Sequence, residues 1–409
     1  MASKRKDNKG RNLNRGEFQR KDLRYQYKYV DMDGKTRTIY DWDLASLRVK
    51  ERQIQRDLED GLYSKINNRY TVNDMFDRYI DMKTELKQST RTNYRYMYDN
   101  YVRPSFGCKR IVDVKYSDVK KFYTMLIKEK GFKPNSMEII HTVLHPVFTF
   151  AMRDGYIRMN PTDGAMAEIK KSHNWEKPKR HALTEEQQSA FINHIVNSET
   201  YNHWLPLFTT FLGTGCRVGE VIGLRWKDCD FENDIISINH NLIYRQQDNG
   251  KCEMHITTPK TKAGTRIVPM LPEVRKALLT EKKNQFRNGN SEESIDGYSG
   301  FVFTNRFGSV HNPMTINRAI VRIYKEYNAI ELERAKAERR EAILIPHFSV
   351  HNLRHTFCTR FCENETNIKV IQEIMGHSDI STTMNIYAEA TESKKKESFK
   401  RLEGKIKIS

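Results

Sequence analysis

The sequence predicts a protein of several domains that is mainly α-helical and contains small β elements. Three observations support this fold class. The chain has 409 residues, which is enough for about two to four domains. Helical apolar periodicity recurs along most of it, whereas alternating or β-branched stretches typical of strands are short. A polar, basic segment at 166–183 interrupts the periodicity and is expected to be a linker.

The composition is strongly basic. The 70 Lys and Arg residues exceed the 52 Asp and Glu residues, which gives a formal net charge of +18 at pH 7. This charge indicates a polyanionic partner. No long apolar run occurs, and the charged N-terminus lacks the apolar core of a signal peptide. We therefore expect a cytoplasmic protein without a membrane span.

The sequence gives no sign of metal or nucleotide chemistry. Its six cysteines are too scattered for a disulfide framework. Cys358 and Cys362 are four residues apart, but no second Cys or His pair has zinc-like spacing, so we interpret them as buried thiols. No Gly-rich phosphate loop of Walker or dinucleotide type is present. We expect neither a metal nor a cofactor.

The N-terminal domain is expected at 1–66. Apolar residues from Leu23 to Tyr29 alternate with Arg24, Gln26 and Lys28, the period-2 pattern of a half-buried strand. The turn Asp31-Met32-Asp33-Gly34 then predicts a β-hairpin, and a helical stripe from about 43 to 60 follows it.

A two-stranded ribbon with a basic face fits the DNA major groove. Arg24, Lys28 and Arg37 are therefore candidate DNA contacts in this hairpin. A basic surface on an accessory domain is the alternative interpretation.

A helical domain is expected at 67–165. Thr71 and Asp74 form a capping-box pattern that opens the first helix. Three more helices end near Pro104, Gly131 and Gly155, which makes a four-helix domain. Its polar faces carry basic residues that either contact DNA or are simply solvated: Arg91, Arg95 and Lys120.

The third domain is expected at 184–392, followed by a tail at 393–409. Thr184 to Gln187 match a capping box and open a mostly helical region. Residues 235–243 and 254–270 are rich in β-branched side chains, which predicts a small sheet and makes the domain mixed α/β.

Four segments of this domain hold charged or nucleophilic side chains that packing does not require: 213–220, 258–266, 351–357 and 375–387. Arginine binds phosphate bidentately, and a lysine on a turn can reach a leaving oxygen. A histidine three residues before an arginine shares its helix face and pairs an acid/base with a phosphate clamp. The candidate residues are Arg217, Lys260 with Lys262 as its alternative, His351, Arg354, His377 and Tyr387.

In this order, the segments resemble the signature of the tyrosine recombinase (phage integrase) family. The resemblance covers about 180–390 through RVGE at 217–220, HNLRHTF at 351–357, GHSDISTT at 376–383 and the following Tyr387. The helical domain resembles the core-binding (SAM-like) domain of that family. The basic hairpin resembles the arm-binding domain of integrases from conjugative transposons.

This resemblance implies a site-specific DNA recombinase that integrates and excises a mobile genetic element. Tyr387 is expected to attack a backbone phosphorus and form a 3′-phosphotyrosine, which conserves energy for religation without ATP. Arg217 and Arg354 are expected to clamp the phosphate oxygens, where two guanidinium groups offset the developing charge. Glu220 is expected to brace the site without reacting.

Proton transfer is expected to fall to three further residues. The resemblance implies that His351 and His377 hydrogen-bond the phosphate and manage the tyrosine proton. Lys260 is expected to protonate the departing 5′ oxygen, with Lys262 as the alternative because it lies on the same turn.

The implied partners are double-stranded DNA at element ends, arm sites and target, and further copies of the chain in a dimer to tetramer. An excisionase is a further expected partner. The tail either docks on a neighbouring protomer or stays solvated. Two other functions remain as alternatives, namely an Xer-like host resolvase and a non-catalytic DNA-binding regulator derived from a recombinase.

Overall fold

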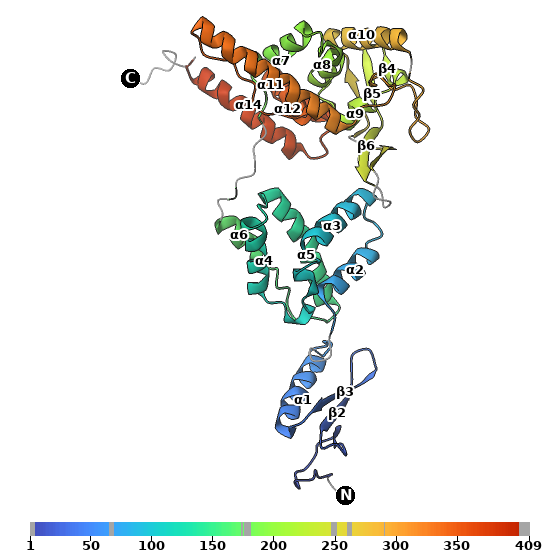
Figure 1. The fold of residues 1–409 in the computed structure, drawn as a ribbon, viewed down its shortest axis with the longest axis vertical. Coiled ribbons are helices and arrows are strands. Elements are labelled where there is room, and N and C mark those ends of the chain that lie inside the picture. The colour runs from blue at the N-terminus through green and yellow to red at the C-terminus, as the bar shows by residue number, and fades with distance from the viewer. Residues whose placement is uncertain are drawn as a thin grey trace. The chain divides into compact units, whose positions relative to one another are not determined.

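The structure is a computed structural model. It describes residues 5–64, 69–172, 175, 181–246, 252–259, 264–289 and 291–400, with the backbone alone at 246 and 391–400. The chain divides into two compact units, Met1–Pro178 and Lys179–Ser409 (Figure 1). Within these described ranges, no helix is both long and apolar enough to cross a membrane.

The first unit begins with an antiparallel sheet in the order β1-β2-β3 and a helix. Its elements are β1 (Glu17–Gln19), β2 (Tyr25–Val30), β3 (Thr36–Asp41) and α1 (Leu44–Glu59). The predicted hairpin and helix are confirmed, and β1 is an additional strand that pairs Glu17 with Tyr27. The three tyrosines of β2 are buried against Leu47 and Ile54 of α1.

Leu23 does not belong to this buried row. It is 55% exposed and has a φ of 67° in the turn before β2, where its N–H donates to Arg20. The alternating pattern therefore predicts a strand that begins two residues too early. Leu23 lies in the turn, and the buried face of the strand begins at Tyr25.

The rest of the first unit is a helical module. Its α-helices are α2 (Val72–Met82), α3 (Gln88–Tyr101), α4 (Tyr116–Lys128), α5 (Pro134–Arg153) and α6 (Ala165–Ser172), with short 3-10 turns η1 (Phe106–Cys108) and η2 (Ile111–Asp113). The capping box at Thr71 and Asp74 is confirmed. The module has its own core, in which the rings of Phe76 and Tyr98 stack.

Helix α6 occupies the start of the segment that the sequence predicts as a linker. Ala165, Met166 and Ile169 are buried in the core of the helical module, at the i, i+1, i+4 spacing that gives a helix one apolar face. The flanking lysines conceal this short stripe in the sequence. Of residues 173–180, only Trp175 is described.

The second unit packs helices around two small sheets. Its helices are α7 (Glu185–Asn197), α8 (Leu205–Thr214), α9 (Val218–Ile222), α10 (Pro272–Asn288), α11 (Pro313–Glu338), α12 (Val350–Asn364), α13 (Ile368–Met375) and α14 (Ile380–Lys400), with 3-10 turns η3 (Asn202–Trp204) and η4 (Trp226–Asp228). Its strands are β4 (Cys229–Asp230), β5 (Ile235–Ile238), β6 (Asn241–Gln246), β7 (Cys252–Thr257) and β8 (Arg266–Pro269).

The strands form a sheet in the order β4-β5-β8 and a separate β6-β7 hairpin, both antiparallel. The mixed α/β architecture predicted for this unit is confirmed. Helix α12 is central, because it packs against α8, α11, α13 and α14. Three of the four candidate segments therefore meet around one helix (Figure 1).

Candidate active site

Arg217 precedes α9 and occupies its N-cap position. Its backbone N–H donates to Glu220 Oε2, and its Nη1 donates to Glu220 Oε1, each at 2.8 Å. The Arg-x-Gly-Glu spacing thus produces a helix start whose carboxylate holds the arginine. Arg217 Nη2 donates to the carbonyl of Gly376 at 2.7 Å, and 39% of the side chain remains exposed.

Gly215, two residues before this arginine, lets α8 and α12 approach each other closely. Gly215 ends α8 in the left-handed region with a φ of 60°, and a Cβ there would lie 2.3 Å from the ring of Phe357 on α12. Only glycine fits both the conformation and the space. The absence of a side chain at Gly215 therefore lets the end of α8 approach α12 closely.

Helix α12 carries His351 and Arg354 one turn apart. His351 is exposed in the first turn, whereas Arg354 is only 4% exposed. Arg354 Nη1 donates to the carbonyl of Gly215 at 2.7 Å, and Nη2 donates to the carbonyl of Met375 at 2.6 Å. Burial and the charge of Arg217 lower the pKa of Arg354 to about 10, so it remains a cation at pH 7.

His377 follows the end of α13 and is 8% exposed. Its Nδ1 shares a 2.9 Å hydrogen bond with the hydroxyl of Thr383 on α14, which fixes the ring. Burial and the nearby charges of Arg354 and Arg217 lower the pKa of His377 to about 4. The imidazole is therefore neutral at pH 7 in the free protein.

Tyr387 lies on α14 and is partly buried. Its ring packs on an apolar cluster that includes Cys358, Cys362 and Met375. Met375 is also the residue whose carbonyl accepts from Arg354. The cluster thus places the tyrosine helix against α12 and the end of α13. The two cysteines pack there as buried thiols, as the sequence analysis predicts.

Lys260 and Lys262 lie outside the described residues. The strands that flank their segment pair with other partners, β7 with β6 and β8 with β5. The described strands on either side of the two lysines therefore belong to different sheets and do not form one hairpin. A Cβ at Gly264 would lie 2.4 Å from that of Pro259, so the two described ends of the segment lie close together.

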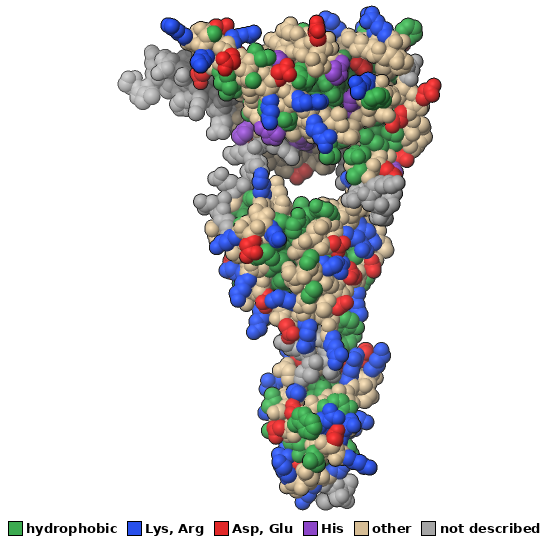
Figure 2. Space-filling view, viewed as in Figure 1, with side chains coloured by type: hydrophobic (Ala, Val, Ile, Leu, Met, Phe, Trp, Pro, Cys, Tyr) green, Lys and Arg blue, Asp and Glu red, His purple; other side chains and the backbone are tan. Residues whose placement is uncertain are grey.

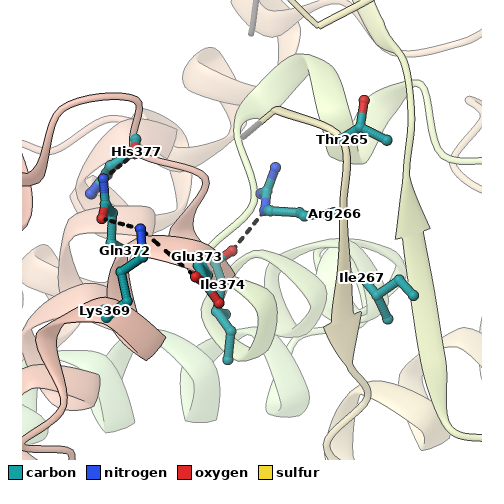
Figure 3. A pocket seen from close by; sticks show the side chains of 8 residues that line it. All are labelled: Thr265, Arg266, Ile267, Lys369, Gln372, Glu373, Ile374 and His377. Atoms are coloured by element: carbon teal, nitrogen blue, oxygen red, sulfur yellow. Dashed lines mark hydrogen bonds and ion pairs between the residues drawn. The ribbon is translucent and has the colours of Figure 1, made fainter. Parts of the chain in front are cut away.

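The sequence analysis missed Arg266, which bonds to Glu220 and to the end of α13. This residue begins β8, and its side chain is 6% exposed. Figure 3 shows it extending from β8 toward the end of α13, where its Nε donates to the carbonyl of Ile374 at 2.7 Å. Beside it, a cavity of about 360 Å³ is lined by residues including Thr265, Gln372 and His377. The signal that could have identified it is a lone arginine directly before three apolar or proline residues.

Glu220 joins this arginine to Arg217. Its carboxylate accepts from Arg266 Nη1 at 3.1 Å and from Nη2 at 2.8 Å, in addition to its bonds with Arg217. Burial alone would raise the pKa of Glu220, but the hydrogen bonds and charges of the two arginines lower it to about 2. Glu220 is therefore an ionised brace between two guanidinium groups.

The candidate DNA contacts of the N-terminal sheet separate onto two faces. Lys28 is exposed opposite Thr38, on the face away from the buried tyrosines. Arg24 lies over the rings of Tyr40 and Trp42. Arg37 pairs in register with the buried Tyr29, so it belongs to the other face.

Arg37 makes ion pairs with Asp31 at 3.2 Å and Asp33 at 3.0 Å. Because its register also places it on the other face of the sheet, we separate it from Arg24 and Lys28. The sequence grouped the three because it gives residue types but not strand register.

The basic candidates of the helical module are engaged within the module. Arg91 donates to the carbonyls of Ile80 and Lys83 at the end of α2. Arg95 pairs with Asp81, and Lys120 pairs with Glu168. Figure 2 shows Lys and Arg side chains intermixed with carboxylates on the visible face of this module. Their contact with DNA stays a prediction.

Comparison with known families gives three matches along the chain. A model described as the phage integrase family matches residues 181–394. A model of the DNA binding domain of Tn916 integrase matches 1–58, and one of the N-terminal SAM-like domain of phage integrases matches 71–127.

Whole-chain comparisons agree with these matches. The chain is 33% identical to the transposase from transposon Tn1545 of Streptococcus pneumoniae and 33% identical to the transposase from transposon Tn916 of Enterococcus faecalis. Each comparison covers 96% of this chain and 95% of the relative. A solved structure of the Tn1549 transposon integrase in complex with a circular intermediate DNA is similar, with 31% identity and a TM-score of 0.70 over 81% of this chain and 99% of the other. The chain therefore belongs to the phage integrase family and is a tyrosine-type site-specific recombinase, an enzyme that cleaves and rejoins DNA strands.

Proposed function

We propose that the chain integrates and excises a conjugative transposon by cutting and rejoining DNA through a 3′-phosphotyrosine on Tyr387. The observation that carries this proposal is the convergence of Arg217, Arg354 and His377 on the end of α13, with Tyr387 on the next helix. The relatives named as Tn916 and Tn1545 transposases, similar over almost the whole chain, support the substrate class.

The proposed reaction is a phosphoryl transfer without a cofactor. The phenol oxygen of Tyr387 forms a bond to phosphorus and loses its proton, while the bond from phosphorus to the 5′ oxygen breaks. Arg217 and Arg354 stabilise the charge on the non-bridging oxygens, and because their hydrogen bonds fix them beforehand, little reorganisation is needed. Religation by a 5′ hydroxyl reverses the same steps.

The protons need separate carriers. We propose that His377, which is neutral at pH 7, and the exposed His351 hydrogen-bond the phosphate and manage the tyrosine proton. We propose Lys260, with Lys262 as the alternative, as the acid that protonates the 5′ oxygen. Along the sequence, both lysines shortly precede Arg266, which shares Glu220 with Arg217.

We propose that the outer face of the N-terminal sheet binds arm-type DNA through Lys28 and Arg24. Lys28 is exposed and the partly exposed Arg24 lies over aromatic rings, which suits a polyanionic groove. Each chain carries one Tyr387, so exchanging four DNA strands requires several copies, and we propose a dimer to tetramer on DNA, with an excisionase as an accessory partner. We also propose that the protein works in the cytoplasm, where the DNA of a conjugative transposon would be available to it.

The test is a trapping experiment on nicked DNA from a transposon end. Cleavage next to the nick releases a short fragment, so religation fails and a covalent protein–DNA adduct survives SDS. We expect wild type to form this adduct and Tyr387→Phe, which lacks the nucleophilic oxygen, to form none while binding the DNA equally well. Wild type that binds but forms no adduct would favour the non-catalytic regulator instead.

A further inference from the structure

The carbonyls at the end of α13 accept hydrogen bonds from backbone N–H groups and from three arginine side chains. The C-terminal carbonyls of a helix lack partners within the helix and form the negative end of its dipole. The carbonyls of Gln372 and Glu373 accept from the N–H groups of Gly376 and His377. The next three, of Ile374, Met375 and Gly376, each accept from a different arginine, namely Arg266, Arg354 and Arg217.

Arg266 differs from the other two arginines because its hydrogen bonds are complete. A guanidinium has five N–H groups. The Nε of Arg266 donates to Ile374, Nη1 to Glu220 and more weakly to Gly264, and Nη2 to Glu220 and to the thiol of Cys216. No N–H is left for DNA, so Arg266 does not itself bind the phosphate.

Arg266 also determines how much positive charge Arg217 can offer. Glu220 accepts from Arg217 and Arg266 together. Without Arg266, Arg217 and Glu220 would form a neutral pair, and the carboxylate would oppose the phosphate. With Arg266, the trio keeps one net positive charge, and Arg217 remains the partly exposed member.

We propose that Arg266 is a positioning residue of strand cleavage. It holds Glu220 and the end of α13, and thereby fixes Arg217 and keeps its charge available for the scissile phosphate. This inference rests on the proposed function and adds to it a residue that acts through Arg217.

The experiment compares Arg266→Lys with wild type in single-turnover cleavage of the nicked DNA, at saturating protein. Lysine keeps the charge but cannot bridge Glu220 and Ile374 in the same way. We expect DNA affinity within about threefold of wild type and a cleavage rate lower by about 10- to 100-fold. A substrate with a methylphosphonate at the scissile position, which lacks one negative charge, should reduce this defect by at least about fivefold, because less charge needs stabilisation.

Arg225→Lys is the matched control. Arg225 and Asp228 form another buried bidentate pair in the same unit, with bonds of 2.9 and 3.1 Å, and Arg225 lies over the ring of Tyr298. Arg225→Lys should lower the melting temperature. Any effect that it has on the cleavage rate should be the same for the phosphodiester and the methylphosphonate substrate. A global effect of Arg266→Lys would slow both substrates equally.

A second variant covers the case in which Arg266→Lys does not fold. Arg266→Met combined with Glu220→Gln removes both buried charges together, which buried pairs tolerate better than the loss of one partner. We expect it to cleave faster than Arg266→Met alone, since no carboxylate then opposes Arg217. Wild-type rates for a folded Arg266→Lys, equal defects on both substrates, or no recovery in the double variant would overturn the inference. An adduct that is absent in wild type, or present in Tyr387→Phe, would instead refute the proposed function.

Discussion

Cationic side chains in two regions of the molecule differ in what surrounds them. At the end of α13, Arg266 and Arg354 are almost fully buried and donate to backbone carbonyls or to Glu220. On the N-terminal sheet, Arg24 keeps 38% of its side chain exposed, pairs with Asp22 and lies over surface rings. The fold fixes the first group before DNA arrives, whereas the second group stays at the surface.

This difference bears on what each region can do. Charges in a buried site interact more strongly and are screened less by salt than exposed charges. Arg354, fixed among these buried charges, therefore suits one phosphate in one geometry, and the exposed face suits the many phosphates of a DNA backbone. Changes to the first should alter the rate of cleavage, and changes to the second should alter affinity in a salt-dependent way.

Arg354→Lys should give the largest effect in the buried region. A lysine cannot donate to both Gly215 and Met375 and still face the phosphate, so preorganisation is lost. We expect single-turnover cleavage to fall by about 1,000-fold, near the upper range for loss of one preorganised donor, and the defect to persist from low to high salt. The measurement is adduct formation on nicked DNA at several ionic strengths. Cleavage within threefold of wild type would show that Arg354 does not clamp the phosphate.

Glu220→Gln tests the buried region through stability. The folded-state pKa of about 2 lies below the usual 4.5, so the unfolded chain takes up the proton first as pH falls. Glu220 therefore contributes stability above pH 4.5 that is lost as the pH falls toward 2. We expect the difference in unfolding free energy between wild type and Glu220→Gln to shrink by about 2 kcal/mol between pH 5 and 3, measured by urea unfolding.

Glu281→Gln is the control for this experiment. Burial raises the pKa of Glu281, in α10 of the same unit, to about 7. Its ionisation therefore costs stability as the pH rises from 4.5 to 7, opposite in sign to Glu220. A Glu220→Gln difference that does not change with pH would mean that Glu220 is not held ionised by the arginines.

The sequence predicts the structural features that depend on residues close together along the chain. The capping boxes at Thr71 and Thr184, the tyrosine strand and the helix after it follow from spacing alone. The family pattern also identifies Arg217, Arg354 and His377, which the structure brings to one helix end.

The remaining features depend on contacts between distant segments. The face of Arg37 is set by pairing with Tyr29, which residue types do not reveal. Arg266 meets Glu220, Cys216 and Ile374 only after β8 and α13 pack together. The short apolar stripe of α6 can be recognised as a helix face only from the core of the helical module that it covers.

Lys28→Ala should give the smallest effect and tests the exposed region. Lys28 lies on the outer face of β2, whereas Arg37, one strand away, lies on the opposite face and is paired with Asp31 and Asp33. Neutralising one phosphate contact lowers the slope of log affinity against log salt by about 1 and weakens binding several-fold. We expect Lys28→Ala to do this for arm-type DNA and to leave the cleavage rate of bound nicked DNA unchanged, while Arg37→Gln keeps the wild-type slope. Equal slope changes in the two variants would show that DNA does not distinguish the faces of the sheet. A slope change with Arg37→Gln alone would move the contact surface to the side that carries α1.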